Sequence, residues 1–231
     1  MLDRTITLFL NGSESLFVDG LAWTATQTAT WLPLVLVLLY VVIRNNDLGG
    51  VLRVVLGIAL SILFADQVAS SVFKPLVERW RPTNDPSFMY MVDVVRGYRG
   101  GSYGFFSSHA ANTMAVATFL TFTIKNKELS IWLYSWCLLN CWSRVYLGVH
   151  YVGDLFVGCV WGFFVGWMMY RLFILRYEKK RFQLRLQSVN SMSSTTSLTP
   201  VHYSLGSLHI FICALSLTYL YIIFKALFFE G

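Results

Sequence analysis

The sequence predicts an all-α, polytopic membrane protein built as a bundle of six transmembrane helices. Hydrophobic residues make up 56% of the 231 residues, charged residues make up only 13%, and the hydrophobic residues gather in long runs. A soluble domain of this composition would lack the polar residues needed to cover its surface. Because about 20 apolar residues cross the hydrocarbon core of a bilayer as a helix, the runs are expected to be membrane spans.

Six apolar segments have a length suited to crossing the bilayer. They run approximately over residues 21–43, 54–73, 108–124, 129–149, 152–175 and 208–228. The first is diluted by threonines in its outer half, and the fourth is interrupted by Asn140, Ser143 and Arg144. The amino terminus does not have the positive stretch followed directly by an apolar core that marks a removable signal peptide. The first span is therefore expected to stay in the protein.

The other segments fit a single membrane-embedded domain over residues 1–231. Residues 1–20 alternate apolar and polar side chains, which is typical of a helix lying in the membrane interface. Residues 177–205 are polar and rich in Ser and Thr, which indicates a flexible cytoplasmic linker before the last span, 208–228.

The net charge of +6 is arranged in a way that indicates topology rather than nucleic-acid binding. Lys and Arg near span ends mark the cytoplasmic side, and they follow the first, third and fifth spans, so both termini are expected on the opposite side. The loop after the second span breaks this rule, and catalysis would explain its cations. The cytoplasmic cations are Arg44, Arg53, Lys125, Lys127, Arg171, Arg176, Lys179, Lys180, Arg181 and Arg185, and the exceptions are Arg79, Arg81, Arg96 and Arg99.

Two polar motifs flank the loop between the second and third spans. KPLVERWRP supplies two fixed cations, Lys74 and Arg81. YGFFSSHAAN is a glycine-bearing turn that leads through Ser107, Ser108 and His109 into the third span. The free N–H groups at a helix start can hold an anion there.

A third motif, SRVYLGVHYVGD, lies between the fourth and fifth spans. It places Arg144 six residues before His150 and His150 four residues before Asp154, so one helical turn can align the last pair. All three motifs fall on the non-cytoplasmic side of the predicted topology. Because ionisable groups near the bilayer are costly unless they pair or serve a function, this convergence favours a single site.

In this order the motifs resemble those of the type 2 phosphatidic acid phosphatase superfamily. The family pattern is Lys-x6-Arg-Pro, then Pro-Ser-Gly-His, then Ser-Arg-x5-His-x3-Asp, and the resemblance runs from Lys74 to Asp154, about a third of the chain. The chain departs from it at Phe106 and Ser108, where the family has proline and glycine. Glycine lets the backbone approach a phosphate closely, so Ser108 puts part of the substrate geometry in question.

The resemblance implies a metal-independent lipid phosphatase that works through a phosphohistidine intermediate and uses no cofactor. It implies that His150 is the nucleophile and that Asp154 holds the other ring nitrogen of His150. His109 would protonate the departing lipid oxygen and later take a proton from the attacking water. The groups expected to bind the phosphate oxygens are Lys74, Arg81, Ser107, Ser108 and Arg144.

The implied substrate is a membrane lipid phosphate or pyrophosphate that approaches sideways from the bilayer. Lipid A phosphate and undecaprenyl pyrophosphate are favoured, because a compact, bacterial-looking chain with an outward site fits the remodelling of envelope lipids. The expected location is the bacterial inner membrane, with the site facing the periplasm, and neither nucleic acid nor an obligate protein partner is expected. Residues 83–104 are expected to cover the mouth of the site.

Other interpretations stay open at this point. The phosphohistidine could pass its phosphoryl group to another lipid, or the chain could be a carrier that binds lipid phosphates without turnover. Vanadium haloperoxidases resemble the same constellation, but the membrane spans disfavour them. Taken singly, Lys74, Arg79, Arg81 and Arg144 could be anchors that reach toward lipid headgroups. Asp66 is interpreted as a structural residue paired within the bundle.

Overall fold

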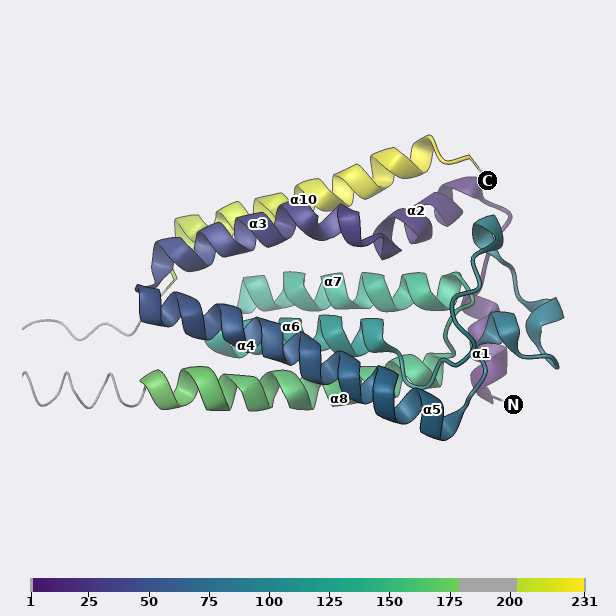
Figure 1. Cartoon of the computed structure of the whole chain (residues 1–231). Helices are drawn as coiled ribbons and strands as arrows, with labels where there is room; N and C mark the ends of the chain where they lie inside the picture. Colours follow the sequence, from purple (N-terminus) through teal and green to yellow (C-terminus); the bar gives the residue numbers. More distant parts are fainter. Residues whose placement is uncertain (1, 179–202, 231) are drawn as a thin grey trace, which may run out of the picture.

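The computed structural model describes residues 2–178 and 203–230, and these residues form helices joined by turns and loops (Figure 1). The predicted all-α class is confirmed. The α-helices are α1 (Leu2–Leu10), α2 (Leu16–Thr26), α3 (Thr28–Asn45), α4 (Leu48–Gln67), α5 (Lys74–Val77), α6 (Ser108–Ile124), α7 (Lys127–Tyr146), α8 (Val152–Met169) and α10 (Leu205–Leu227). Two π-helical segments, Val68–Phe73 and Tyr170–Leu175, continue α4 and α8, and short 3-10 turns lie at Pro82–Asn84, Met89–Met91 and Val95–Gly97.

Every predicted span lies largely in helix, but not every helix is long and apolar enough to cross a membrane. Four helical stretches of the described chain are long and apolar enough to do so: Thr28–Asn45, Leu48–Val77, Val152–Glu178 and Leu205–Leu227. The helix α6 has only 17 residues, and α7 contains the polar residues Asn140 and Arg144. The protein is therefore a helical membrane protein with four candidate spans, and the count of six stays a prediction.

The first predicted span, residues 21–43, is wrong in its outer half. The chain breaks at Gln27, whose backbone is extended, so that α2 ends and α3 begins on either side of it. Thr30 Oγ1 and Trp31 Nε1 donate hydrogen bonds of 2.7 and 2.9 Å to the carbonyls of Thr24 and Ala25. These side chains add hydrogen bonds to carbonyls at the end of α2, where a helix leaves carbonyls without intrahelical partners, which stabilises the break.

The structure shows the helices of the predicted interfacial segment. Residues 2–20 contain the short helix α1 and the start of α2, and their position in the membrane interface stays a prediction. Most of the predicted linker, namely residues 179–202, lies outside the described residues.

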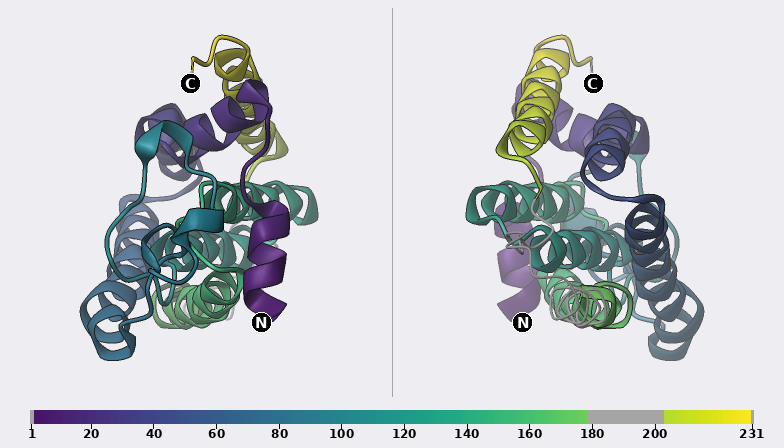
Figure 2. Two further views of the ribbon diagram at one scale, coloured as in Figure 1. Left: turned by 90° about the vertical axis from the view of Figure 1, so that its right-hand side faces the viewer. Right: turned by 90° about the vertical axis from the view of Figure 1, so that its left-hand side faces the viewer.

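The centre of the bundle is α6, which packs most closely against α8 and also contacts α4 and α7 (Figure 2). Glycines spaced four residues apart on α8 make this approach possible. A Cβ on Gly162 would lie 2.3 Å from the carbonyl oxygen of Ala111, and one on Gly166 would lie 2.3 Å from that of Ala115. Small residues let two helix backbones approach closely where lipid supplies no hydrophobic driving force.

The helices α2, α3 and α10 form a second group beside this centre (Figures 1 and 2). Trp31 of α3 connects the group to the rest, with its ring 5.9 Å from that of Trp136 on α7 and 6.4 Å from that of Tyr219 on α10. Although α3 and α4 are consecutive, they diverge from their shared turn and contact each other little.

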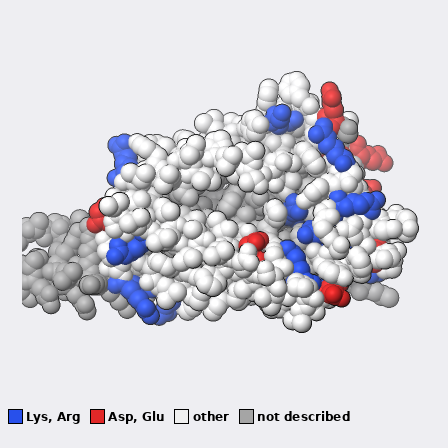
Figure 3. Space-filling view, viewed as in Figure 1, with Lys and Arg blue, Asp and Glu red and all other residues white. Residues whose placement is uncertain are grey.

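Charged side chains gather at the two ends of the bundle, and a broad band between them is nearly free of charge on the face shown in Figure 3. Such a band is what a hydrocarbon environment requires. The loop of residues 78–107 covers the end at which both labelled chain ends lie (Figure 1). The turns after α3 and α6 lie at the opposite end.

Candidate active site

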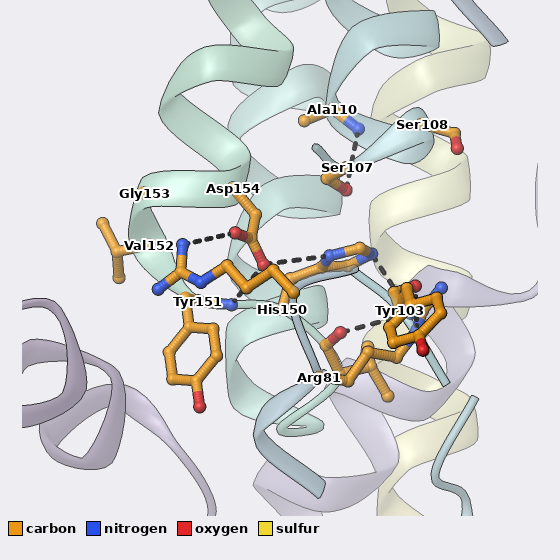
Figure 4. Close-up of polar contacts among 12 residues, drawn as sticks. Arg81, Tyr103, Ser107, Ser108, Ala110, His150, Tyr151, Val152, Gly153 and Asp154 are labelled. Carbon is orange, nitrogen blue, oxygen red and sulfur yellow. Dashed lines mark hydrogen bonds and ion pairs between the residues drawn. The ribbon is translucent and has the colours of Figure 1, made fainter. Parts of the chain in front are cut away.

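His150 lies in the turn between α7 and α8, and its side chain is almost completely buried. Arg81 Nη1 lies 3.2 Å from its Nε2 atom (Figure 4). A guanidinium can only donate hydrogen bonds, so Nε2 is the accepting nitrogen and the neutral ring carries its proton on Nδ1. The lone pair of Nε2 therefore faces a fixed cation.

Asp154 lies in the first turn of α8 and is fully buried. Its Oδ2 atom is 3.6 Å from Nδ1 of His150 and accepts a hydrogen bond of 3.1 Å from the Tyr151 N–H (Figure 4). Its Oδ1 atom accepts a hydrogen bond of 2.7 Å from Arg79 Nη1. The carboxylate thus faces the ring nitrogen that carries the proton, while two other donors fix its position.

Gly104 lets the covering loop approach this pair. A Cβ at this position would lie 3.2 Å from Asp154 Oδ2 and 3.4 Å from His150 Nδ1. The Gly104 N–H donates a hydrogen bond of 2.8 Å to the Arg79 carbonyl, which fixes the loop there. A larger residue would press on both the imidazole and the carboxylate.

Lys74 and Arg144 add two cations to the one supplied by Arg81. Lys74 Nζ donates a hydrogen bond of 2.6 Å to Ser108 Oγ. Arg144 is 3% exposed and donates from its Nη atoms to Thr26 Oγ1 and to the Tyr98 hydroxyl. Its Nε has no hydrogen-bond partner among the described residues. A buried guanidinium N–H in this state is suited to an anionic oxygen.

These groups surround one cavity of about 500 Å³. Ser107 and Asp154 do not line it, although both were predicted as site residues. The Ser107 hydroxyl accepts a hydrogen bond of 3.5 Å from the Ala110 N–H, and so caps α6. Its predicted contact with phosphate stays a prediction. The six predicted residues that do line the cavity are Lys74, Arg81, Ser108, His109, Arg144 and His150.

The electrostatic field around His150 favours its neutral form. Burial lowers the pKa of His150 well below its usual value, and the nearby cations Arg81 and Arg144 lower it further. Burial also lowers the pKa of Arg81, and the charge of Arg144 adds to that effect. The site therefore combines an uncharged imidazole with a concentration of positive charge, which is suited to binding an anion next to a nitrogen lone pair.

Sequence reasoning missed part of the lining. Asp66 was interpreted as structural, but it lines the cavity together with Ser70. These residues precede Lys74 at intervals of four, and Lys74 Nζ donates a hydrogen bond of 3.1 Å to Ser70 Oγ. That spacing was available in the sequence as a signal for one helix face. Asn112, three residues after His109, also lines the cavity, and its Oδ1 is buried without a partner among the described residues.

The loop of residues 83–104 covers the cavity, as predicted. Tyr98, Gly100 and Gly101 form part of its wall, and the Tyr98 hydroxyl accepts a hydrogen bond of 3.2 Å from Arg144. Arg99 Nη1 and Thr83 Oγ1 exchange hydrogen bonds of 2.7 and 2.9 Å with each other's backbone carbonyls, which holds the loop over the site.

An apolar groove of about 490 Å³ continues from the polar cavity. It lies between the diverging helices α3 and α4, with α6, α7 and α10 at its base, and the face in Figure 3 is hollowed there. The groove and the cavity share four lining residues, so they adjoin. These residues are Trp31, Ile62, Val116 and Trp136.

One group of thiols within the described part of the chain could hold a metal ion. The sulfurs of Cys137, Cys141 and Cys159 lie within 4.8 Å of one another between α6, α7 and α8. The group does not line the polar cavity, but Thr113 does, and its hydroxyl is 3.3 Å from Cys137 Sγ. Sequence alone does not indicate this group, because the three residues have no paired metal-binding spacing.

A helical membrane bundle with an imidazole, a carboxylate and three cations at the head of an apolar groove has the architecture of a membrane-embedded phosphatase. A profile of the PAP2 superfamily matches residues 50–178, and the chain belongs to that superfamily. The resemblance of its three motifs is thereby confirmed.

Similar proteins agree with this assignment. The chain is 40% identical over 170 residues to a lipid A 4'-phosphatase of Bacteroides thetaiotaomicron, covering 73% of this chain and 76% of the relative. It is 33% identical over 180 residues to a lipid A 4'-phosphatase of Porphyromonas gingivalis, covering 78% of this chain and 75% of the relative. Together with the family, these relatives identify the chain as a lipid phosphatase.

A solved structure shares the fold. The crystal structure of a transmembrane PAP2-type phosphatidylglycerolphosphate phosphatase from Bacillus subtilis superposes with a TM-score of 0.51 at 23% sequence identity. The alignment covers 73% of this chain and 82% of that one.

Proposed function

We propose that the protein removes the 4'-phosphate of lipid A. The observation that carries this proposal is that the polar cavity and the apolar groove between α3 and α4 adjoin and share four lining residues. A lipid phosphate needs both: cations for its headgroup and an apolar surface for its acyl chains. The two relatives named lipid A 4'-phosphatase direct the choice among lipids toward lipid A.

The chemistry begins with a phosphate monoester whose oxygens are held by Lys74, Arg81 and Arg144. Nε2 of His150 attacks phosphorus, the bond from phosphorus to the lipid oxygen breaks, and the new bond is P–N. Asp154, which faces Nδ1 at 3.6 Å, steadies the positive charge that the ring acquires. His109 lines the same cavity and gives a proton to the departing lipid oxygen.

The second half of the reaction returns the enzyme to its starting state. His109, now neutral, takes a proton from water as the water oxygen attacks phosphorus, and the P–N bond breaks. Free phosphate leaves, and His150 is again a neutral imidazole. In this scheme the residues supply the nucleophile, the acid and base and the charge stabilisation. The lowered pKa of His150 supports the first of these roles, because it keeps the nucleophilic imidazole neutral.

We assign the site to the periplasmic side of the bacterial inner membrane. The positive residues Arg44, Arg53, Lys125 and Lys127 lie next to the turns after α3 and α6, at the end of the bundle away from the loop of residues 78–107. Cytoplasmic loops carry such an excess of Lys and Arg. The opposite end, which holds the site and the labelled chain ends, would then face the periplasm.

The proposal is tested with purified protein in detergent, in the presence of a chelator, by measuring phosphate release from a lipid panel. The panel contains lipid A with and without its 4'-phosphate, phosphatidic acid, phosphatidylglycerol phosphate and undecaprenyl pyrophosphate. We expect release from lipid A only when the 4'-phosphate is present, and loss of release in His150→Ala. The matched control is His209→Ala, since His209 is exposed on α10 and does not line the cavity.

Each other outcome corrects a different part of the proposal. Preferential release from another lipid would replace lipid A as the substrate. Activity retained by His150→Ala would remove the phosphohistidine step. With a substrate that carries a radiolabelled phosphate, loss of the label from the lipid without release of free phosphate, and its recovery on an added lipid acceptor, would make the protein a phosphotransferase.

A further inference from the structure

The carboxylate that faces His150 depends on a single arginine for its charge compensation. Asp154 is fully buried. Apart from His150, Arg79 is the one ionisable side chain that forms a salt bridge with it in the described part of the chain, at 2.7 Å. A buried carboxylate that loses its cationic partner is strongly destabilised and takes up a proton more readily. Arg79 therefore controls both the position and the charge of Asp154.

Arg79 is itself held from two sides. Its Nη2 atom donates a hydrogen bond of 2.6 Å to Oδ2 of Asp3, which belongs to α1. Its guanidinium carbon lies 4.2 Å from the centre of the Tyr151 ring, in a cation–π contact. The charge pair raises the pKa of Arg79 even though burial alone would lower it, so this arginine is a permanent cation. Its orientation is fixed by α1 rather than by the covering loop alone.

Asp3 also contacts the start of the helix that carries Asp154. Its Oδ1 atom accepts a hydrogen bond of 2.9 Å from the Gly153 N–H. The contacts form a closed ring that runs from Asp3 through Arg79 to Asp154 and returns through Gly153. A ring of this kind fixes the carboxylate relative to the backbone of the His150 turn more firmly than one ion pair could.

The same face of α1 holds the rest of the turn. Thr7 Oγ1 accepts a hydrogen bond of 3.3 Å from the Val152 N–H. Asn11 Nδ2, just beyond the helix, donates a hydrogen bond of 2.8 Å to the Tyr146 carbonyl. Asp3, Thr7 and Asn11 are spaced by four residues, which places them on one side of a helix. This side contacts the chain just before and just after His150.

We propose that Arg79 is a positioning residue for Asp154, and through it for His150, and that α1 completes the active site by holding Arg79 through Asp3. This inference rests on the proposed role of His150 as nucleophile. A sequence motif cannot reveal it, because Asp3 lies about 150 residues before the group it serves. Neither Asp3 nor Arg79 lines the polar cavity beside His150, so their effect is on the geometry of the imidazole rather than on substrate binding.

The test compares Arg79→Gln, Asp3→Asn and the double variant with wild type on the lipid phosphate that wild type hydrolyses best. Because a displacement of about 1 Å at a reacting group can cost about 100-fold in rate, we expect kcat to fall about 100-fold in Arg79→Gln and about tenfold in Asp3→Asn, with KM nearly unchanged. Residues acting through one network are not additive, so the double variant should match Arg79→Gln. Added guanidinium should partly restore Arg79→Ala.

The matched control is Arg4→Gln. Arg4 is the next residue on α1 and forms a salt bridge of 2.7 Å with Asp85, outside the ring described above. It should keep kcat within about twofold of wild type, since the Arg4 side chain is half-exposed and such ion pairs contribute little. If α1 had a purely structural role, Arg79→Gln, Asp3→Asn and Arg4→Gln would all have a similarly lowered thermal midpoint and a similarly lowered active fraction.

A second measurement does not depend on turnover. In ¹⁵N-histidine-labelled protein, the Nδ1 proton of His150 should be protected from exchange in wild type and in Arg4→Gln, and should exchange faster in Arg79→Gln. Folded Arg79→Gln with wild-type kcat and an unchanged Nδ1 signal would overturn the inference. If wild type releases no phosphate from any lipid, but the Nδ1 proton still exchanges faster in Arg79→Gln than in wild type, the proposed function is refuted and the positioning role stands.

Discussion

Lys74 Nζ donates a hydrogen bond of 2.6 Å to the hydroxyl of Ser108, the residue that stands where the superfamily pattern has glycine. Serine at this position therefore has a structural role: its hydroxyl, which glycine lacks, orients Lys74 at the amino-terminal end of α6. Lys74 Nζ also donates a hydrogen bond of 3.1 Å to Ser70 Oγ, which itself lies 3.1 Å from the Ser108 hydroxyl. Two of the three ammonium protons of Lys74 are thus occupied, which leaves one for a phosphate oxygen.

Replacement of Ser108 with alanine should weaken phosphate binding. Hydrogen bonds to charged groups contribute about 1.5–3 kcal/mol, so we expect kcat/KM to fall about tenfold or more, chiefly through KM. Steady-state kinetics on a lipid phosphate measures this. Ser71→Ala is the control, because Ser71 is exposed and bonds to Gln67 rather than to the site. Equal kinetics for the two variants would mean that the Ser108 hydroxyl does not orient Lys74 in the working enzyme.

The imidazole of His150 should stay neutral at and below ordinary cytoplasmic or periplasmic pH. Its pKa is lowered by burial and by the charges of Arg81 and Arg144, so its protonation should begin only well below pH 6.5. A ¹⁵N titration of the free enzyme measures this directly, and the chain has only 4 histidines to assign. In Arg144→Gln the midpoint should rise toward the usual value. A wild-type midpoint at or above 6.5 would contradict the electrostatic description.

The same shift has a consequence for stability. A histidine that is neutral in the folded state and free to take up a proton in the unfolded state lowers the stability as pH falls below its unfolded pKa, about 6.5. The free energy of unfolding should therefore decrease between about pH 6.5 and the lower folded pKa of His150. Thermal midpoints of wild type and His150→Asn over this range should converge as the pH falls. Parallel curves would show that another group governs the acid sensitivity.

Gly162→Ala should destabilise the bundle even though alanine is the better helix former. The added Cβ would lie 2.3 Å from the Ala111 carbonyl oxygen, so α6 and α8 must separate. Overpacking of this kind costs about 1–3 kcal/mol. Gly206→Ala, on α10, meets nothing within 4 Å and should be neutral or slightly stabilising. Thermal unfolding in detergent compares them, and a Gly162→Ala midpoint no lower than that of Gly206→Ala would contradict the close packing.

Blocking the groove between α3 and α4 should affect lipids according to chain length. Ala59 lines the groove, so Ala59→Trp should lower kcat/KM at least tenfold for a long-chain lipid phosphate and leave a short-chain soluble phosphate ester nearly unchanged. Leu63→Trp is the control, since Leu63 is exposed on α4 and does not line the groove. Equal losses for long and short substrates in Ala59→Trp would show that the groove does not receive the chains.

Local patterns in the sequence were sufficient for much of this architecture. Apolar runs located most of the helices, although the first run is two helices that meet at Gln27, and fixed spacing located residues that meet around His150. The spacing of Gly158, Gly162 and Gly166 is a further local pattern, whose meaning is clear in the structure, where it lets α8 approach α6 closely. Each of these signals is contained within one helix or one turn.

What escaped prediction depends on contacts between distant segments. The break at Gln27 is stabilised by side chains that reach back across it, and the composition there still looked like one diluted span. The link from Asp3 to Arg79 joins residues 76 positions apart. The charge pattern marked Arg79 as an unusual cation, but nothing local marks Asp3 as its partner. Asp66 lies on the same helix face as Ser70 and Lys74, four residues apart. A polar residue that only pairs with a neighbouring helix can show the same spacing, so the spacing alone did not identify Asp66 as a lining residue.

The residues matched by the superfamily profile, 50–178, run from α4 to α8 and contain all the groups to which we assign the chemistry, whereas α3 and α10 lie outside the match. Yet α3 and α10 provide one wall of the apolar groove, through residues such as Leu34, Leu38 and Phe211. The molecule thus has two parts: the reaction chamber lies within the residues that the superfamily profile matches, and part of the groove wall lies outside them. An engineer who wishes to change the lipid specificity without disturbing the chemistry should therefore begin with α3 and α10.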